Sequence, residues 1–158
     1  MKYYNYDVVF QEIPDETTLA INISNCPCRC PGCHSKFLWE DVGVELTVKE
    51  YERILSSLVA DITCVCFMGG DANPAYINHL ATYTYEKYPF LKIGWYTGEE
   101  EISEDINLKY FDYIKVGSYV KRLGGLKSTA TNQRMYKILH PTTNTTKLKD
   151  ITEMFWKD

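Results

Sequence analysis

The chain has 158 residues, of which 45% are hydrophobic and 24% charged, which is ordinary for one soluble globular domain. The formal net charge of −4 and the lack of a Lys/Arg cluster argue against nucleic-acid binding. No run is apolar for long enough to span a membrane, and Met1–Phe10 lacks the apolar core of a signal peptide. We therefore expect no membrane association and a cytoplasmic protein with reduced thiols.

The first half of the chain predicts two strands and one helix. Thr18–Ser24 alternates apolar and polar residues and ends directly at a run of cysteines. Thr47–Ala60 begins with capping-box spacing and carries one apolar stripe, which predicts a helix. Ile62–Met68 is a short apolar run, typical of a buried parallel strand, and it ends at Gly69-Gly70-Asp71.

The second half continues the alternation. Asn73 and Pro74 form an N-cap and first-turn pair, which predicts a helix as far as Tyr88. The strands expected after it are Leu91–Tyr96, Phe111–Val116 and Asn132–Leu139. This order predicts an α/β fold with right-handed crossovers, a parallel sheet and helices outside the sheet.

Chain length restricts the architecture further. A complete eight-unit barrel needs roughly 250 residues, whereas a truncated, partial (open) parallel β/α barrel of about five or six strands fits a shorter chain. The sequence contains no internal repeat and no convincing linker. We therefore predict that residues 1–158 form a single domain of this open-barrel type.

Four motifs follow the C-terminal ends of predicted strands. They are the cysteine run, Gly69-Gly70-Asp71, Thr97-Gly98 and Gly117. In parallel α/β architectures these strand ends share one edge, and ligands bind there. We expect the four motifs to converge on one site.

The cysteine run places four thiols within eight residues, Cys26 to Cys33, among two prolines and a glycine. Thiolates select zinc, copper(I) or iron–sulfur centres, and in a reducing compartment clustered thiols suggest metal or redox chemistry. Structural zinc usually takes two well-separated pairs of ligands. Cys64, Cys66 or His34 could complete such a set, although Cys64 and Cys66 lie in a predicted core strand and are expected to be buried small hydrophobes.

The spacing C-x-x-x-C-x-x-C, formed by Cys26, Cys30 and Cys33, favours a different centre. Three thiolates hold a [4Fe–4S] cubane and leave one iron open to a substrate, and the radical S-adenosylmethionine (SAM) superfamily uses this spacing for that purpose. Cys28 lies outside the pattern and is expected not to be a ligand. Whether Cys28 or His34 contacts the cluster stays open.

Three separated segments resemble the anaerobic ribonucleoside-triphosphate reductase activating proteins, which are radical SAM glycyl-radical activases. They are the Cys26–His34 loop with its Pro-Gly-Cys-His ending, Met68-Gly69-Gly70-Asp71, and Thr131-Asn132-Gln133-Arg134; Tyr96-Thr97-Gly98 also resembles a family tract. Together they span roughly residues 19–137. The last segment narrows the resemblance to the reductase activases, although the role of Asn132-Gln133-Arg134 stays open.

The resemblance implies an oxidoreductase whose cofactors are a [4Fe–4S] cluster and SAM. Cys26, Cys30 and Cys33 would bind the metal and so carry the reductive cleavage of SAM to a 5′-deoxyadenosyl radical. Gly69 and Gly70 would bring the backbone close to SAM, and alternation places Lys115 near the same edge. The candidate cofactor-binding residues are Gly32, Gly69, Gly70, Asp71, Thr97, Gly98 and Lys115.

The sequence departs from the family pattern at two positions. Gly32 stands where many superfamily members have an aromatic residue, so an adenine contact there would come from backbone alone. Asp71 replaces the usual Glu, and it could bind the methionine amino group of SAM or merely cap the following helix.

The resemblance also implies partners. The protein substrate would be the catalytic subunit of the anaerobic (class III) ribonucleotide reductase, and the electron donor a flavodoxin or ferredoxin. Two alternatives stay open: an activase of another glycyl-radical enzyme such as pyruvate formate-lyase, and a non-enzymatic Cys-rich zinc or iron–sulfur module.

Overall fold

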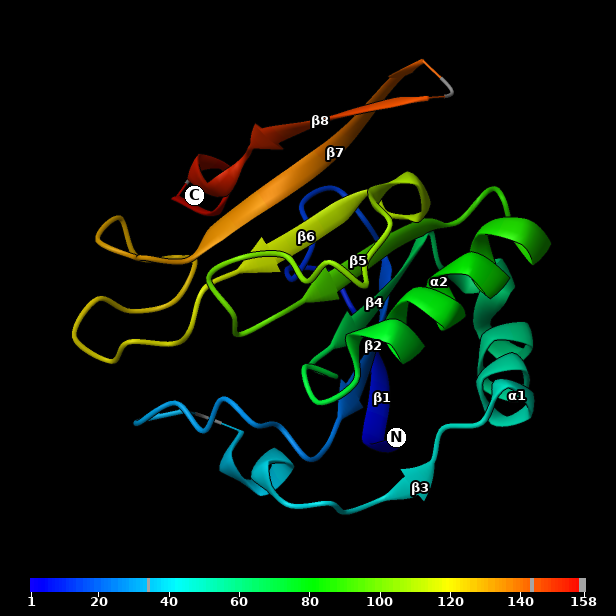
Figure 1. The fold of residues 1–158 in the computed structure, drawn as a ribbon, viewed down its shortest axis with the longest axis horizontal. Helices are drawn as coiled ribbons and strands as arrows, with labels where there is room; N and C mark the ends of the chain where they lie inside the picture. Colours follow the sequence, from blue (N-terminus) through cyan, green and yellow to red (C-terminus); the bar gives the residue numbers. More distant parts are fainter. Residues whose placement is uncertain (34, 143, 157–158) are drawn as a thin grey trace.

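One sheet of eight strands, in the order β3-β1-β2-β4-β5-β6-β7-β8, organises the fold (Figure 1). The computed structural model describes residues 1–33, 35–142 and 144–156. Four central strands run parallel to one another: β2 (Thr18–Ile23), β4 (Cys64–Met68), β5 (Lys92–Tyr96) and β6 (Tyr113–Val116). These are the four parallel strands that the sequence predicted, each with its start shifted by at most two residues.

Antiparallel strands flank the parallel core on both sides. β1 (Lys2–Val9) pairs with β2 and with the short β3 (Val44–Glu45), while β7 (Arg134–Thr142) pairs with β6 and with β8 (Thr145–Asp150). Within the described residues the sheet does not close on itself. The α/β class with a parallel core is therefore confirmed, and the unclosed sheet is consistent with an open, partial barrel. The sheet is mixed and larger than expected, since β1, β3 and β8 were not predicted. The strand expected at Asn132–Leu139 is present as β7, but it runs antiparallel to β6, so the prediction of a wholly parallel sheet was wrong there.

Two α-helices cover one face of the sheet (Figure 1). α1 (Val48–Leu58) begins at the N-cap Thr47, whose hydroxyl accepts from the Glu50 amide at 3.0 Å, and it continues as a 3-10 turn, η2 (Val59–Asp61). α2 (Pro74–Lys87) begins at Asn73, whose side chain accepts from the Tyr76 amide at 3.2 Å. Both predicted helix starts are confirmed. The remaining helical pieces are 3-10 turns: η1 (Lys36–Trp39), η3 (Leu108–Tyr110) and η4 (Thr152–Trp156).

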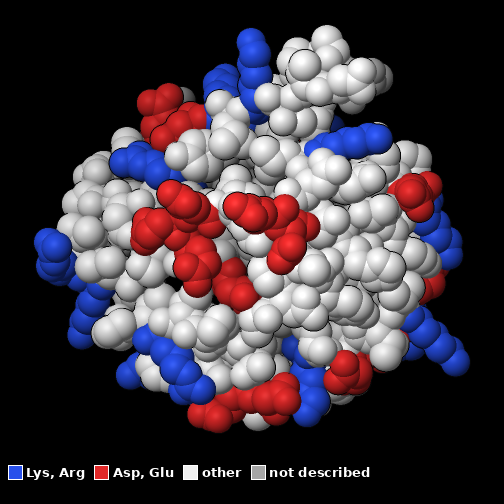
Figure 2. Space-filling model, in the orientation of Figure 1, with Lys and Arg blue, Asp and Glu red and all other residues white. Residues whose placement is uncertain are grey.

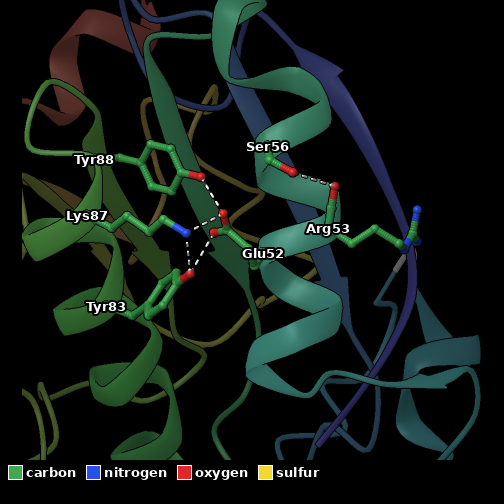
Figure 3. Close-up of polar contacts among 6 residues, drawn as sticks. All are labelled: Glu52, Arg53, Ser56, Tyr83, Lys87 and Tyr88. Carbon is green, nitrogen blue, oxygen red and sulfur yellow. Dashed lines mark hydrogen bonds and ion pairs between the residues drawn. The ribbon is translucent and has the colours of Figure 1, made fainter.

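A polar cluster joins the two helices on their outer side (Figure 3). The Glu52 carboxylate on α1 accepts hydrogen bonds from the Tyr83 hydroxyl at 2.7 Å and from the Lys87 ammonium at 2.6 Å. The Tyr88 hydroxyl donates to the same carboxylate at 2.7 Å. Because one carboxylate receives all three groups, the cluster fixes how α1 lies against α2.

The two faces of the sheet are packed in different ways. The helix face forms the main apolar core, in which Phe67 and Trp95 meet Tyr51 and Ile77 of the helices. The other face is covered by the segment that contains Ile13 and by the C-terminal segment that contains Phe155, and it forms a smaller apolar cluster. Cys64 and Cys66 lie fully buried there as free thiols, which fits the expected core role. Burial raises the pKa of both thiols.

None of the helices in the described residues is long and apolar enough to cross a membrane.

The N-cap of α1 offers a direct test of local stability. Replacing Thr47 by Ala leaves the Glu50 amide without its partner, and we expect a loss of about 1 kcal/mol in the free energy of unfolding. Lys49→Ala, an exposed change in the same turn, is the control and should stay within about 0.5 kcal/mol of the unsubstituted chain. Urea denaturation measures both; equal stabilities would contradict the role of this cap.

Candidate functional site

The parallel strands end level with one another, which brings their following loops to one edge. Asn22 of β2 pairs with Met68 of β4, Met68 with Tyr96 of β5, and Tyr96 with Lys115 of β6. The cysteine loop, the Gly69-Gly70-Asp71 turn, the Thr97-Gly98 turn and Gly117 leave the sheet just beyond these positions. The expected convergence of the four motifs is thus present.

The cysteine loop is tightly wound and anchored to the segment after it. Asn25, Arg29 and Gly32 have left-handed backbones, with φ of 60°, 43° and 78°. The Asn25 amide donates to the Glu40 carbonyl at 2.9 Å, and the Cys26 amide to the Leu38 carbonyl at 2.8 Å. The loop is therefore held between β2 and η1.

All four thiols of the loop are free and partly exposed. The Cys33 amide donates to the Cys30 carbonyl at 3.0 Å, and the Ser35 amide donates to the Cys33 Sγ at 3.4 Å. Backbone amides directed at sulfur tune the thiolates of iron–sulfur centres. Four soft, accessible donors on one wound loop fit the donor chemistry of a [4Fe–4S] cluster.

Asp71 connects three of the converging motifs. Its carboxylate accepts from the Cys28 thiol at 3.5 Å, from the Gly98 amide at 3.0 Å and from the Thr97 hydroxyl. Asn73, and not Asp71, caps α2. Of the two expected roles for Asp71, helix capping is therefore not its role in the structure; a contact with the methionine amino group stays a prediction.

Gly98 lies where a side chain would not fit. A Cβ at this position would stand 2.6 Å from the Cys28 Sγ and 3.1 Å from the Cys28 Cβ. Thr97 is fully buried, and its amide donates to the Lys115 carbonyl at 2.9 Å. The small Gly98 thus allows the cysteine loop to pack directly against the end of β5.

Gly69 and Gly70 both adopt left-handed backbones, with φ of 111° and 92°. A Cβ on Gly70 would also stand 2.6 Å from the Ile77 Cδ1. The Gly69 carbonyl, a candidate acceptor for a ligand ammonium, already accepts from the Trp95 Nε1 at 2.7 Å. Trp95 therefore orients the carbonyl, which keeps a second lone pair.

Lys115 lies on the face of the sheet opposite the helices and is only 7% exposed. Its ammonium donates to the Gly117 carbonyl at 3.0 Å and lies 5.5 Å from the centre of the Tyr96 ring. It takes no part in the ion pairs of the described residues. Burial lowers the pKa of Lys115, with Asp71 acting in the opposite direction.

Asn132 and Gln133 hold the loop that follows β6. The Asn132 Nδ2 donates to the Ser118 carbonyl at 3.0 Å, and the Gln133 Nε2 donates to the Gly117 carbonyl at 3.4 Å. Gly117 thus receives both Gln133 and Lys115. The segment with the most specific family resemblance shapes the site edge through these backbone contacts.

Two candidate positions border the loop. Gly32 packs beneath the aliphatic part of Lys121, since a Cβ on Gly32 would stand 3.2 Å from the Lys121 Cβ. His34 lies outside the described residues, so the question of its contact with a cluster stays open.

Acidic side chains gather near the middle of the face drawn in Figure 2, over the loop that follows β5 in Figure 1. Glu99, Glu100 and Glu101 are exposed in this loop. The Glu99 carboxylate lies 3.8 Å from the Cys28 Sγ, and Glu100 accepts from the Ser118 amide at 3.2 Å. These carboxylates give the site edge a negative electrostatic potential, which favours a cationic ligand.

The Cys26 and Cys28 thiols influence the pKa of one another. A hydrogen bond from the Cys28 thiol lowers the pKa of Cys26 to about 6, and burial opposes this effect. The same hydrogen bond, together with burial and the Asp71 charge, raises the pKa of Cys28. The lowered pKa of Cys26 favours the thiolate, which is the form that binds metals.

Asp71 supports a second test. Asp71→Ala leaves the partly buried Gly98 amide and the buried Thr97 hydroxyl without their acceptor, so we expect a loss of about 1–3 kcal/mol in the unfolding free energy of the cluster-free protein. Asp105→Ala, on the exposed loop nearby, is the matched control. If both variants unfold at the same urea concentration, Asp71 does not join the turns.

Sequence patterns did not single out the contacts of Cys28, Trp95 or Glu99. Cys28 lay outside the three-cysteine spacing, and Trp95 was counted only as part of a strand. The signal available for Cys28 was its position two residues from a predicted ligand. The partners of all three lie far away in the chain, and the strand register decides them.

The chain was compared with known families and proteins. Residues 17–137, which run from β2 into β7, match the family described as the 4Fe-4S single cluster domain. No curated protein and no solved structure matches. The matched segment contains all four loop cysteines, the Gly-Gly-Asp turn, Thr97-Gly98 and Lys115.

Proposed function

Because the chain belongs to the 4Fe-4S single cluster domain family, we propose that it is a radical SAM activase that generates the glycyl radical of the anaerobic (class III) ribonucleotide reductase. Its cofactor is a [4Fe–4S] cluster, and the family implies SAM as the second cofactor. The reductase as target rests on the resemblance of the cysteine loop, the Gly-Gly-Asp turn and Asn132-Gln133-Arg134 to the activase family.

In this proposal Cys26, Cys30 and Cys33 hold the cluster and Cys28 does not. When bound and reduced, the cluster supplies one electron that cleaves SAM to methionine and a 5′-deoxyadenosyl radical. Three thiolates from one wound loop leave one position of the cluster free for SAM.

The neighbouring turns would bind and orient SAM. Gly69 and Gly70 bring backbone close to the loop, and Asp71 presents a carboxylate to a cationic group. Lys115 is a cation suited to the methionine carboxylate, since its ammonium is buried and donates to a neutral carbonyl, that of Gly117. Gly32 could approach adenine only through backbone, because it has no side chain.

One observation carries the proposal: the cysteine loop contacts the turns that end the two neighbouring parallel strands. The Cys28 Sγ lies 3.5 Å from Asp71, and Asp71 accepts from the Gly98 amide. A module that only carried electrons would not need a glycine-rich turn and a carboxylate beside its thiols. The arrangement favours an enzyme with a bound second cofactor.

An open site edge supports the proposed partners. The cysteine loop is partly exposed, and the hollows near it are shallow; one of about 240 Å³ is lined by Asn25 and Gly70. A larger hollow of about 650 Å³ lies elsewhere, against Met154–Trp156, and contains no thiol. We propose that the reductase subunit completes the site and that a flavodoxin or ferredoxin reduces the cluster.

The test mixes the anaerobic, cluster-loaded protein with SAM, a reductant and a class III reductase, and records electron paramagnetic resonance. We expect the doublet of a glycyl radical on the reductase. Pyruvate formate-lyase is the matched substrate control. A doublet on pyruvate formate-lyase alone would assign the chain to the alternative activase class, and no SAM cleavage with either would favour a non-enzymatic module.

A further inference from the structure

Cys26, Cys28 and Asp71 form a compact group that the three-cysteine cluster does not use. One ligand atom from each residue, two Sγ atoms and a carboxylate oxygen, lies within 4.8 Å of the others. All three residues are partly buried. Ligands of a single ion must approach one point, whereas the thiolates of a cubane each bind a different iron, so this geometry suits one ion.

We propose that the cluster-free protein binds one Zn²⁺ through Cys26, Cys28 and Asp71. Binding releases the thiol protons to solvent and leaves two thiolates and a carboxylate on the metal. Zinc takes sulfur and oxygen ligands in a tetrahedral arrangement, and three protein ligands leave a fourth position for water. Glu99 is the nearest further carboxylate, 3.8 Å from the Cys28 Sγ.

The carboxylate of this group is already positioned. Asp71 accepts from the Gly98 amide at 3.0 Å and from the Thr97 hydroxyl, and these bonds orient it toward the Cys28 thiol. Hydrogen bonds behind a metal ligand fix its orientation and raise affinity. Gly98 contributes space as well, because a Cβ there would stand 2.6 Å from the Cys28 Sγ.

The zinc state and the cluster exclude one another, an inference that rests on the proposed function. Cys26 belongs to both ligand sets, so one chain holds either Zn²⁺ or the cluster. Among divalent metals, zinc binds such a site more tightly than ferrous iron. Cys28 therefore creates a competing state that blocks cluster assembly while zinc is bound.

Binding is tested with Co²⁺, a coloured substitute for Zn²⁺, added to the reduced, cluster-free protein under argon. We expect one equivalent to give thiolate-to-cobalt charge-transfer bands, and Zn²⁺ to remove them. Cys28→Ser and Asp71→Asn should weaken binding by more than the roughly 10–100-fold that loss of an outer partner costs. Cys30→Ser is the matched control and should bind Co²⁺ like the unsubstituted chain.

Competition is tested by loading one equivalent of Zn²⁺ before adding ferrous iron and sulfide. The unsubstituted chain should then assemble less cluster than without zinc, while Cys28→Ser should assemble equal amounts with and without it. Cobalt binding that needs Cys30 or Cys33, or equal binding by Cys28→Ser, would overturn the proposed site. Failure of Cys28→Ser to form any cluster would instead contradict the ligand assignment under the proposed function.

Discussion

Replacement of Cys26, Cys30 or Cys33 by Ala, one at a time, is expected to abolish the [4Fe–4S] cluster and all SAM cleavage. Each thiolate would hold one iron, and a cubane that loses one of three protein ligands has no replacement donor in the C-x-x-x-C-x-x-C pattern. Iron and sulfide content, the brown absorbance and 5′-deoxyadenosine yield measure the loss in anaerobically reconstituted protein.

Two cysteine variants serve as controls for this prediction. Cys28→Ala removes a thiol from the same loop but outside the pattern, and it should keep iron content near that of the unsubstituted chain. Cys66→Ala removes a thiol that is fully buried in the sheet, so any effect should come through stability. A Cys26, Cys30 or Cys33 variant that stays brown, or a colourless Cys28→Ala, would show that the cluster uses a different set.

Lys115→Met is expected to stabilise the fold and weaken SAM binding at the same time. Lys115 is 7% exposed and holds its charge against one carbonyl and one aromatic ring. Replacing buried charges by well-packed apolar groups stabilises proteins by about 1–4 kcal/mol in favourable cases. If the ammonium binds the SAM carboxylate, its loss should weaken SAM affinity at least about tenfold.

The stability gain of Lys115→Met depends on pH in a defined direction. Burial lowers the pKa of Lys115 in the folded protein below its ordinary 10.5, which the unfolded chain retains. At pH values between the folded and unfolded pKa, the unfolded chain binds more protons than the folded one, so the stability of the unsubstituted protein rises with pH. The cost of the buried charge is therefore full below the folded-state pKa and disappears above 10.5. The gain in unfolding free energy of Lys115→Met over the unsubstituted protein should therefore be large at pH 7 and small above 10.5.

Urea denaturation of the cluster-free protein at several pH values, compared between the two chains, isolates this effect. The raised pKa of Tyr51, to which Lys115 does not contribute, affects both proteins equally and cancels in the difference. Equilibrium dialysis of SAM with loaded protein gives the affinity. A variant that is less stable at pH 7 and binds SAM normally would contradict the account of Lys115.

The parallel core could be predicted because local sequence patterns mark its strands and helices. Ile62–Met68 is continuously apolar, and the helix starts at Thr47 and Asn73 carry their own capping residues. The flanking strands lack such signals. β8 is exposed along its whole length, and β3 has only two residues, so their pairing with neighbours, not their composition, makes them strands.

The sequence was enough to predict which loops meet at the site but not which side-chain atoms contact one another. The rule that parallel strands share an edge placed the cysteine loop beside Asp71 and Gly98. Which thiol meets Asp71 depends on the register of β2, β4 and β5 and on the left-handed turns at Asn25 and Arg29. That contact joins residues 43 positions apart, and no local pattern encodes it.

The role of Asn132 and Gln133 shows the same limit. The sequence shows their resemblance to an activase motif. Their hydrogen bonds to the Ser118 and Gly117 carbonyls, however, depend on the antiparallel pairing of β7 with β6. Both side chains hold a backbone loop at the site edge by hydrogen bonds. A sequence motif alone does not distinguish a residue that holds a loop in place from one that binds a cofactor.

Cleavage of the sulfonium cofactor by this chain alone is the most direct measurement. Reconstituted, oxygen-free protein with dithionite and SAM, without any protein partner, should release 5′-deoxyadenosine and methionine in equal amounts, while the Cys30→Ala chain should release neither. An iron-loaded, folded chain that leaves SAM intact both alone and with the reductase added would contradict the account.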